Sequence, residues 1–190
     1  MPSPNKLTDR DENPVDRVLL KLSMDSLPFW YRTGHTANTL TTYKCIFGLL
    51  AWYNLRMRRV MWFGGFAIIS YFFDCADGQM ARTYGMVSNF GDRYDHCTDI
   101  ILVGLYLHAF HTNYKGQKTY GAIVAILGVA WILTMMALGC QQRLKPGDTH
   151  ETLDRLKVLC QNASVTQYWG TGPLLLLFIC TVAWMERIAP

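Results

Sequence analysis

Four aspartates between residues 74 and 99 have the types and spacing for metal-assisted chemistry. Asp74 and Asp77 are three residues apart, so on a helix they share one face. Asp95 and Asp99 are four residues apart and share a face in the same way. Four carboxylates brought together repel one another unless they bind protons or hard cations. Oxygen ligands with little His or Cys among them suit Mg2+, Mn2+ or Ca2+, and two such ions about 4 Å apart are typical of phosphoryl-transfer sites.

Two apolar runs flank these aspartates, from Val60 to Phe73 and from Ile100 to Phe110. Carboxylates placed this deep in apolar sequence are costly unless they meet a cation, a proton or water. Residues that loosen or end helices separate the two acidic pairs: Gly78, Gly85, Asn89 and Gly91. The sequence therefore predicts two helices joined by a tight turn near residues 84–90, with the four carboxylates facing one another.

The stretch also carries a family pattern, which reads Asp74-x2-Asp77-Gly78-x2-Ala81-Arg82-x8-Gly91-x3-Asp95-x3-Asp99. This pattern resembles the signature of the CDP-alcohol phosphotransferases (CDP-alcohol phosphatidyltransferase class I), membrane enzymes that make phospholipids from CDP-activated donors. It agrees with that signature at every position. Upstream, Asn38-x-Leu40-Thr41 is similar to a segment that often precedes the first membrane helix in this family, although a simple helix cap would read the same.

The resemblance implies a two-metal site for Mg2+ or Mn2+. Its implied ligands are Asp74, Asp77 and Asp95. Asp99 is the implied general base and touches one metal as well. In the implied reaction, an alcohol hydroxyl attacks the β-phosphorus of the donor and CMP leaves.

The other signature residues are implied to bind the donor substrate. Gly78 and Ala81 would leave room for the nucleotide, and Arg82 would pair with its phosphates or ribose. Gly91 would permit a close approach of helices near the site. As ion pairs, Arg82 and Arg93 would balance only two of the four carboxylates, which favours bound metal ions over buried salt bridges.

Several neighbouring residues have simpler interpretations. Gly85, like Gly91 taken alone, reads as a packing position. Asp92 lies off the face of the acidic pair and reads as a solvated or capping residue. His96 more often caps a helix or bonds a carboxylate than acts as a catalyst, and His108 and His111 look interfacial.

The composition indicates one membrane-embedded domain. Of 190 residues, 51% are hydrophobic and 17% are charged, against roughly 25% charged residues in soluble proteins. The net charge of +4 is scattered over helix ends, which fits anionic lipid headgroups rather than nucleic acid. The six cysteines show no C-x-x-C spacing, so no disulfide framework or metal-thiolate site is expected.

The chain in order predicts an all-α integral membrane protein, a bundle of five to six transmembrane helices with an N-terminal interfacial amphipathic helix. Residues 1–13 are expected to be disordered, and residues 14–190 to form a single CDP-alcohol phosphotransferase membrane domain. The amphipathic helix is expected over residues 14–30, capped by Asn13; packing against the domain is the alternative to a place in the interface. Spans are expected at residues 39–55, 60–80, 89–112, 119–140 and 168–185. The family generally has six spans, so a short amphipathic helix at 149–160 or a re-entrant element at 152–165 stays open.

Basic residues predict the orientation in the membrane. With the N-terminus in the cytosol, Arg82 and Arg93 face the cytosol. The basic loop at residues 56–59 would then lie on the far side, which argues against that orientation. Both acidic pairs then lie at the cytosolic face, and the Asn162-Ala163-Ser164 sequence carries no glycan. Lys44, near the start of the first span, is expected to snorkel to the interface or to reach a phosphate.

Three functions remain open from the sequence. The favoured one is transfer of a phosphatidyl group from CDP-diacylglycerol to a small alcohol, and Ile100 argues against a phosphorylated acceptor. The second is an aminoalcohol phosphotransferase that uses CDP-choline or CDP-ethanolamine and diacylglycerol, whose members are similar around Phe73-Asp74-Cys75 and Asp95-His96-x-x-Asp99. The third is a non-catalytic divalent-cation-binding or transporting membrane protein, which does not account for Gly78, Ala81 and Arg82. The family resemblance also implies a homodimer, and membrane lipids are expected to surround the protein.

Overall fold

A computed structural model describes residues 12–144, 158, 160 and 165–188, without the side chains of residues 142–144 and 165. All regular structure in this part of the chain is helical, which confirms the all-α class. The helices are α1 (Pro14–Arg32), α2 (Ala37–Arg56), α3 (Val60–Thr83), α4 (Asn89–Tyr114), α5 (Tyr120–Leu144), α7 (Val165–Tyr168) and α8 (Thr171–Ile188). The expectations for residues 1–11 and for most of residues 149–165 lie outside the described residues.

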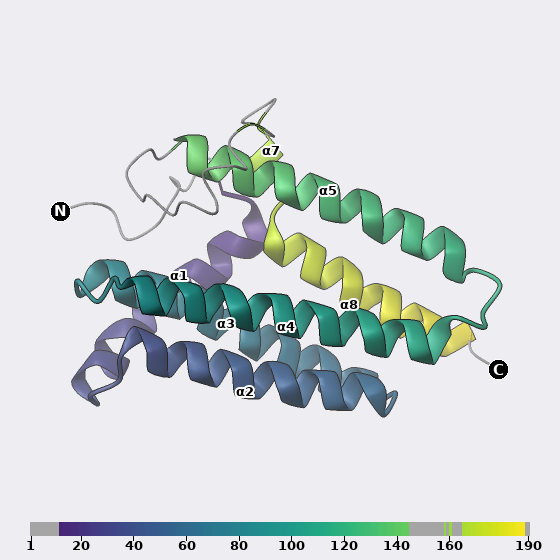
Figure 1. Ribbon diagram of the computed structural model, residues 1–190, viewed down its shortest axis with the longest axis horizontal. Helices are drawn as coiled ribbons and strands as arrows, with labels where there is room; N and C mark the ends of the chain where they lie inside the picture. Colours follow the sequence, from purple (N-terminus) through teal and green to yellow (C-terminus); the bar gives the residue numbers. More distant parts are fainter. Residues whose placement is uncertain (1–11, 145–157, 159, 161–164, 189–190) are drawn as a thin grey trace.

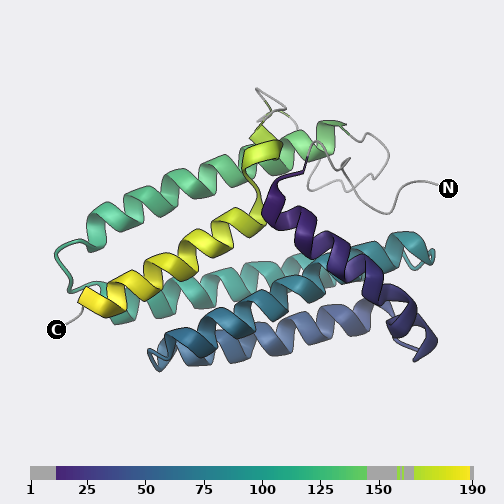
Figure 2. The same cartoon turned by 180° about the vertical axis from the view of Figure 1, so that it is seen from behind.

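Helices α2, α3 and α4 lie side by side along the molecule, and α5 and α8 run along the opposite side (Figure 1). Helix α2 packs most extensively on α3 and next on α4. Helix α1 crosses α3 obliquely and also reaches the start of α8, as seen from behind in Figure 2. The chain reverses direction between α3 and α4, so the end of α3 and the start of α4 lie together at one end of the bundle.

Local sequence explains where these helices begin and turn. Asn13 caps α1, because its side chain accepts a hydrogen bond from the backbone N–H of Asp16. Thr36 caps α2, and the side chain of Ser88 caps α4. Gly85 has φ of +67° in the turn between α3 and α4, a backbone conformation that glycine adopts without strain. The predicted tight turn is therefore present.

The core divides into two clusters along the bundle. The cluster away from the aspartates joins α2, α3, α4, α5 and α8, and its members include Phe63, Phe110, Tyr114 and Met185. The cluster near the aspartates joins α1, α2 and α3 through Leu27, Leu40, Phe73 and Met80. Burying one such side chain stabilises the fold by about 1.5–3 kcal/mol. This second cluster fixes the segment of α3 that carries the first acidic pair.

Three helices are long and apolar enough to cross a membrane within the described residues: α3, α5 over Tyr120–Gln141, and α8. Large apolar side chains on these helices face outward, among them Met61, Trp62 and Ile132. Helices α2 and α4 are long but more polar, since α4 carries the aspartates in its first turns and α2 carries a lysine. The described residues therefore fit an integral membrane protein with three candidate spans by length and composition, and five or six spans remain an expectation.

The cysteines differ from the expectation in one pair. Cys140 and Cys160 form a disulfide, with Cα atoms 4.7 Å apart. Cys45, Cys75, Cys97 and Cys180 are free thiols. No disulfide framework was expected, and this one bridge was missed because Cys160 meets the last turns of α5, a contact that cysteine spacing does not reveal. Asn13 also differs from the expected disorder of residues 1–13, since it is fully buried.

Candidate functional site

Lys44 joins three of the four signature aspartates. Its Nζ lies 2.6 Å from Oδ1 of Asp74 and 2.5 Å from Oδ1 of Asp95, and it also contacts Oδ1 of Asp99. Three helices meet here, because α2 supplies the lysine, α3 supplies Asp74 and α4 supplies the other two. One carboxylate oxygen from each of the three aspartates lies within 4.8 Å of the others. We call these three carboxylates the acidic cluster.

Asp77 lies beside the acidic cluster but outside it. Its side chain is buried, and its Oδ2 accepts a hydrogen bond of 2.7 Å from Oγ1 of Thr41. It is near enough to Asp74 and Asp95 to interact with both electrostatically. Thr41 precedes Lys44 by one helical turn, so the same face of α2 contacts Asp77 and the acidic cluster. The structure thus gathers three of the four predicted metal ligands and sets the fourth alongside.

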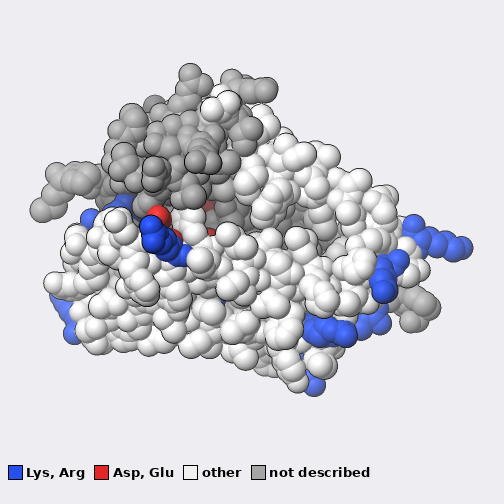
Figure 3. Space-filling model, in the orientation of Figure 1, with Lys and Arg blue, Asp and Glu red and all other residues white. Residues whose placement is uncertain are grey.

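The acidic cluster is open on one side. The side chain of Lys44 is 3% exposed, whereas those of Asp74 and Asp95 are 29% and 30% exposed and that of Asp99 is 50% exposed. In the space-filling view, a few acidic atoms are visible beside a basic side chain, and further lysines and arginines lie toward the ends of the molecule (Figure 3). Among the three, Asp99 is therefore the carboxylate that an incoming molecule meets most easily.

Two signature glycines lie where added atoms would collide. A Cβ on Gly91 would lie 2.8 Å from Oδ1 of Asn38 and 3.0 Å from Oγ of Ser88, so Gly91 allows α4 to approach the start of α2. A Cβ on Gly78 would lie 3.2 Å from Nη1 of Arg82, whose guanidinium group covers this part of α3. Asn38 also lines a pocket of about 260 Å³ at the start of α2.

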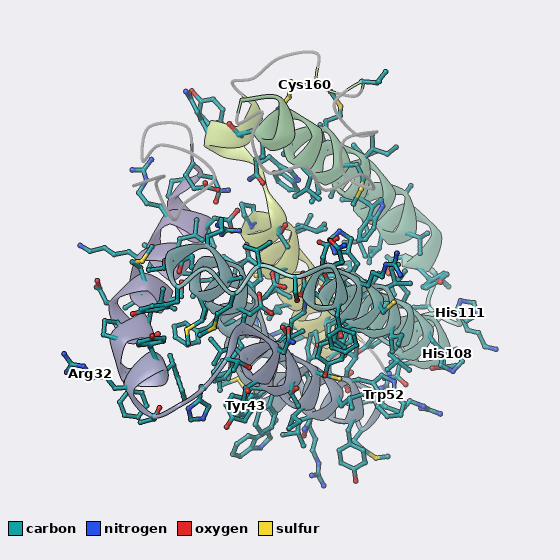
Figure 4. The ribbon with its side chains drawn as sticks, turned by 60° about the vertical axis from the view of Figure 1, so that its left-hand side comes forward. Arg32, Tyr43, Trp52, His108, His111 and Cys160 are labelled. Atoms are coloured by element: carbon teal, nitrogen blue, oxygen red, sulfur yellow. A yellow bond between two sulfur atoms is a disulfide. The ribbon has the colours of Figure 1, made fainter. Side chains whose placement is uncertain are left out.

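The remaining signature and histidine residues take simpler positions. Ala81 packs against the core cluster near the aspartates. His96 places Nδ1 at 3.6 Å from Oδ1 of Asp92 and at 3.9 Å from Oδ2 of Asp95. His108 and His111 are exposed toward the other end of α4 (Figure 4), and Nδ1 of His111 lies 2.8 Å from the hydroxyl of Tyr120 at the start of α5.

A second buried carboxylate, Asp16, lies close to the site and was not predicted. Its oxygens accept hydrogen bonds from Nδ2 of Asn13 at 2.6 Å, the hydroxyl of Tyr71 at 2.7 Å and the backbone N–H of Gly172 at 2.8 Å. It thereby joins α1, α3 and the first turn of α8. Burial raises the pKa of Asp16, and the hydrogen bonds from Asn13, Tyr71 and Gly172 oppose that effect.

The sequence contained a signal for one of these unpredicted contacts but not for the other. A lysine inside an apolar run is costly unless it is paired, so the position of Lys44 in the sequence favours a carboxylate partner. Asp16 looked like part of the polar face of an amphipathic helix, and nothing in its spacing marks it as buried.

The donors of the acidic cluster fit a hard divalent cation. Two oxygens bound to one Mg2+ ion lie at most about 4.2 Å apart, and two bound to one Ca2+ ion at most about 5 Å apart. The oxygens of the acidic cluster lie within 4.8 Å of one another, so they can converge on one such ion directly or after a small shift. Histidine and thiol ligands are not needed for such an ion. The ammonium group of Lys44 lies among the same oxygens, so a cation entering the cluster meets a resident positive charge.

Comparison with known proteins gives one match. Residues 34–186 match the family model described as CDP-alcohol phosphatidyltransferase. No curated protein and no solved structure matches the chain. The matched region contains α2 through α8, and therefore the acidic cluster, Asp77 and Lys44, but it begins after α1 and Asp16.

Proposed function

Because the chain belongs to the CDP-alcohol phosphatidyltransferase family, we propose that it moves a phosphatidyl group from CDP-diacylglycerol to a small alcohol with release of CMP. Membership of the family makes the protein a phosphotransferase for substituted phosphate groups, with a place in phospholipid biosynthesis. It also sets aside the third function considered, a cation-binding protein without catalysis. The observation that carries the proposal is the acidic cluster, placed where three helices meet and open on the side of Asp99.

In this proposal the carboxylates hold Mg2+ or Mn2+. Asp74, Asp77 and Asp95 are the ligands, and Asp99 shares one ion. When bound, the ions neutralise the donor diphosphate and stabilise the charge that develops on its oxygens. The buried hydrogen bond from Thr41 orients Asp77, which keeps that carboxylate directed at the site.

Asp99 acts as the general base. Its carboxylate takes the proton of the acceptor hydroxyl while the hydroxyl oxygen forms a bond to the β-phosphorus of the donor. The bond from that phosphorus to the oxygen of CMP breaks, and CMP leaves with the bonding electrons. The exposure of Asp99 supports this assignment, because the acceptor alcohol arrives from outside the cluster.

The donor lies against α3 and the start of α4. Arg82 binds its phosphates or ribose, a task suited to a planar guanidinium group. Gly78 adds no side chain beside the guanidinium of Arg82, and Ala81, which also packs against the core cluster, stays small, so that the nucleotide can approach α3. Gly91 keeps α4 close to Asn38, and this closeness sets the width of the site.

The membrane arrangement is also part of the proposal. Helix α2 has 20 residues and α4 has 26, enough at 1.5 Å per residue to cross a hydrocarbon core of about 30 Å. With these two the bundle has five spans, and α1, which carries polar and apolar faces, lies in the interface. A homodimer rests on family membership alone.

We place the aspartates at the cytosolic face on the distribution of basic residues. The disulfide at the end of α5 lies toward the same end of the bundle (Figure 1), and disulfides are rare in the cytosol. The free, exposed thiol of Cys97 lies between Asp95 and Asp99 in α4 and can decide the matter. A membrane-impermeant maleimide should label it from the cytosolic side of sealed vesicles; labelling only from the other side reverses the orientation.

The aminoalcohol branch is the second candidate, favoured by the sequence around Asp74 and by the Asp95-His96 pair. Exchange of labelled CMP distinguishes the two. Purified protein is placed in vesicles of phospholipid and diacylglycerol with Mg2+ or Mn2+, and either CDP-diacylglycerol or CDP-choline is added. The proposal predicts that label enters CDP-diacylglycerol. Label in CDP-choline alone would assign the aminoalcohol reaction, and label in neither donor would contradict both.

A further inference from the structure

Lys44 occupies a position that the proposed reaction does not explain. Its ammonium group has three N–H donors and contacts one oxygen on each of three carboxylates. The backbone carbonyl of Lys44 accepts a hydrogen bond of 2.9 Å from Oγ of Ser70, which anchors this turn of α2 on α3. The anchored backbone directs the side chain into the acidic cluster, so the ammonium group pairs with carboxylates of the protein.

The charges within this group do not balance. One ammonium faces three carboxylates, and Asp77 adds a fourth negative charge nearby. A single positive charge reduces the repulsion among the carboxylates but leaves net negative charge in the cluster. The arrangement is therefore stable enough to form, yet it still attracts further cations.

We propose that Lys44 is a built-in counter-ion, a positioning residue that takes the place of a divalent cation in the metal-free site and yields that place when the metal binds. This inference rests on the metal-dependent function proposed above. The three carboxylates that Lys44 contacts are the same three whose oxygens lie close enough together for a hard cation, so the ammonium group and the metal ion compete for one site. A lysine side chain suits exchange because its charge is compact and its four-carbon stem is flexible.

The consequence is a competition that can be measured without turnover. While Lys44 occupies the cluster, a metal ion must displace its contacts, so the apparent metal affinity is lower than the carboxylates alone would give. Removing the ammonium should tighten metal binding and, at the same time, weaken the metal-free fold. A lysine that served only as a permanent structural ion pair would produce the opposite change in affinity, because its loss would disorder the ligands.

The test is Mn2+ binding, followed by electron paramagnetic resonance in detergent solution without nucleotide. We expect Lys44→Met to bind Mn2+ about tenfold more tightly than the unaltered protein, the change produced by about 1.4 kcal/mol. Without metal, the variant should melt at a lower temperature, and saturating Mn2+ should remove that difference. Lys44→Arg keeps the charge and should show neither change. Lys115→Met, an exposed lysine beyond the far end of α4, controls for the loss of one positive charge. Unchanged or weaker Mn2+ binding by Lys44→Met would overturn the inference.

A variant that does not fold without metal still decides the question. Lys44→Met purified with Mn2+ present should then recover its fold, because the cation supplies the missing charge. Failure to recover, with Lys44→Arg folding normally, would overturn the inference. The proposed function is tested apart from this, by CMP exchange. Tighter Mn2+ binding without any exchange would contradict the function alone, and exchange with unaltered Mn2+ affinity would contradict the role of Lys44 alone.

Discussion

The carboxylate of Asp16 and the acidic cluster lie near each other and are stabilised in opposite ways. Asp16 accepts hydrogen bonds from three uncharged donors, on Asn13, Tyr71 and Gly172. The acidic cluster gathers three carboxylates around the single ammonium of Lys44. Tyr71, which holds Asp16, precedes Asp74 by only one turn of α3. The two groups therefore share one helix and differ in what surrounds them.

The difference separates a structural carboxylate from a functional one. Neutral donors fixed by three helices satisfy the hydrogen-bonding capacity of the Asp16 carboxylate, so it needs no further ligand. Several like charges around one cation leave unsatisfied negative charge, and such a site binds cations and the groups that cations bind. Burial alone does not make a carboxylate structural, because Asp77, a proposed metal ligand, is almost as buried as Asp16, although the three carboxylates of the acidic cluster are 29–50% exposed.

The comparison predicts that the largest loss of activity follows from a substitution within the acidic cluster. Asp99→Asn removes the proposed base while keeping its size, so CMP exchange should fall by about 10²- to 10⁴-fold. Binding of Mn2+ should remain largely in place, because the other carboxylates still hold the ion. Asp92→Asn, on the same helix but off the face of the pair, is the matched control and should keep exchange. Turnover retained by Asp99→Asn would remove its role as base.

Asp16 should affect stability and leave the chemistry intact. Asp16→Ala leaves the hydroxyl of Tyr71 and the N–H of Gly172 without their acceptor, and each unsatisfied buried group costs about 1–3 kcal/mol. Thermal unfolding in detergent should show a lower midpoint, whereas Mn2+ affinity of the folded protein should not change. A normal midpoint combined with lost Mn2+ binding would mean that Asp16 is one of the metal-binding carboxylates.

Gly172 tests the same contact from the side of α8. A methyl group there would overlap the carboxylate of Asp16, so Gly172→Ala should destabilise the protein by about 1–3 kcal/mol. Gly128 in α5 offers a matched control, since a Cβ there meets nothing within 4 Å. Equal unfolding midpoints for Gly172→Ala and Gly128→Ala would show that α8 does not depend on Asp16.

Gly91 should give the smallest change. A methyl group at this position meets Asn38, whose side chain can turn away, and Ser88, whose cap on α4 would be weakened, so Gly91→Ala should cost about 1 kcal/mol of unfolding free energy. Displacement of α4 should reduce CMP exchange by about tenfold, since small shifts of reacting groups are costly. Adding Asn38→Ala should restore part of the lost exchange. No restoration would place the effect of Gly91 elsewhere.

Much of the architecture could be predicted because its signals are local. The starts of α2 and α4 follow from Thr36 and Ser88 as caps, and the turn between α3 and α4 follows from Gly85. The apolar runs predict the ends of most helices to within a few residues. The signature spacing likewise indicated which carboxylates share a face, since that depends on helix geometry alone.

The contacts between distant segments could not be predicted in the same way. Asp16 and Gly172 are 156 residues apart, and neither shows its partner in its own neighbourhood. The disulfide depends on Cys160 meeting the end of α5. Lys44 was expected to snorkel to the interface or to reach a phosphate, whereas its place among the carboxylates depends on how α2 packs on α3 and α4. Tertiary packing therefore decides which charged residues become partners.

The central claim is that the carboxylates around Lys44 bind divalent cations for phosphatidyl transfer. The most direct measurement is an anomalous difference map from crystals grown with Mn2+ and CDP-diacylglycerol. The account predicts Mn2+ peaks among Asp74, Asp77, Asp95 and Asp99, with the diphosphate beside them and Lys44 withdrawn from at least one of its carboxylates. A donor bound in the same crystals with no Mn2+ at these four residues would contradict it.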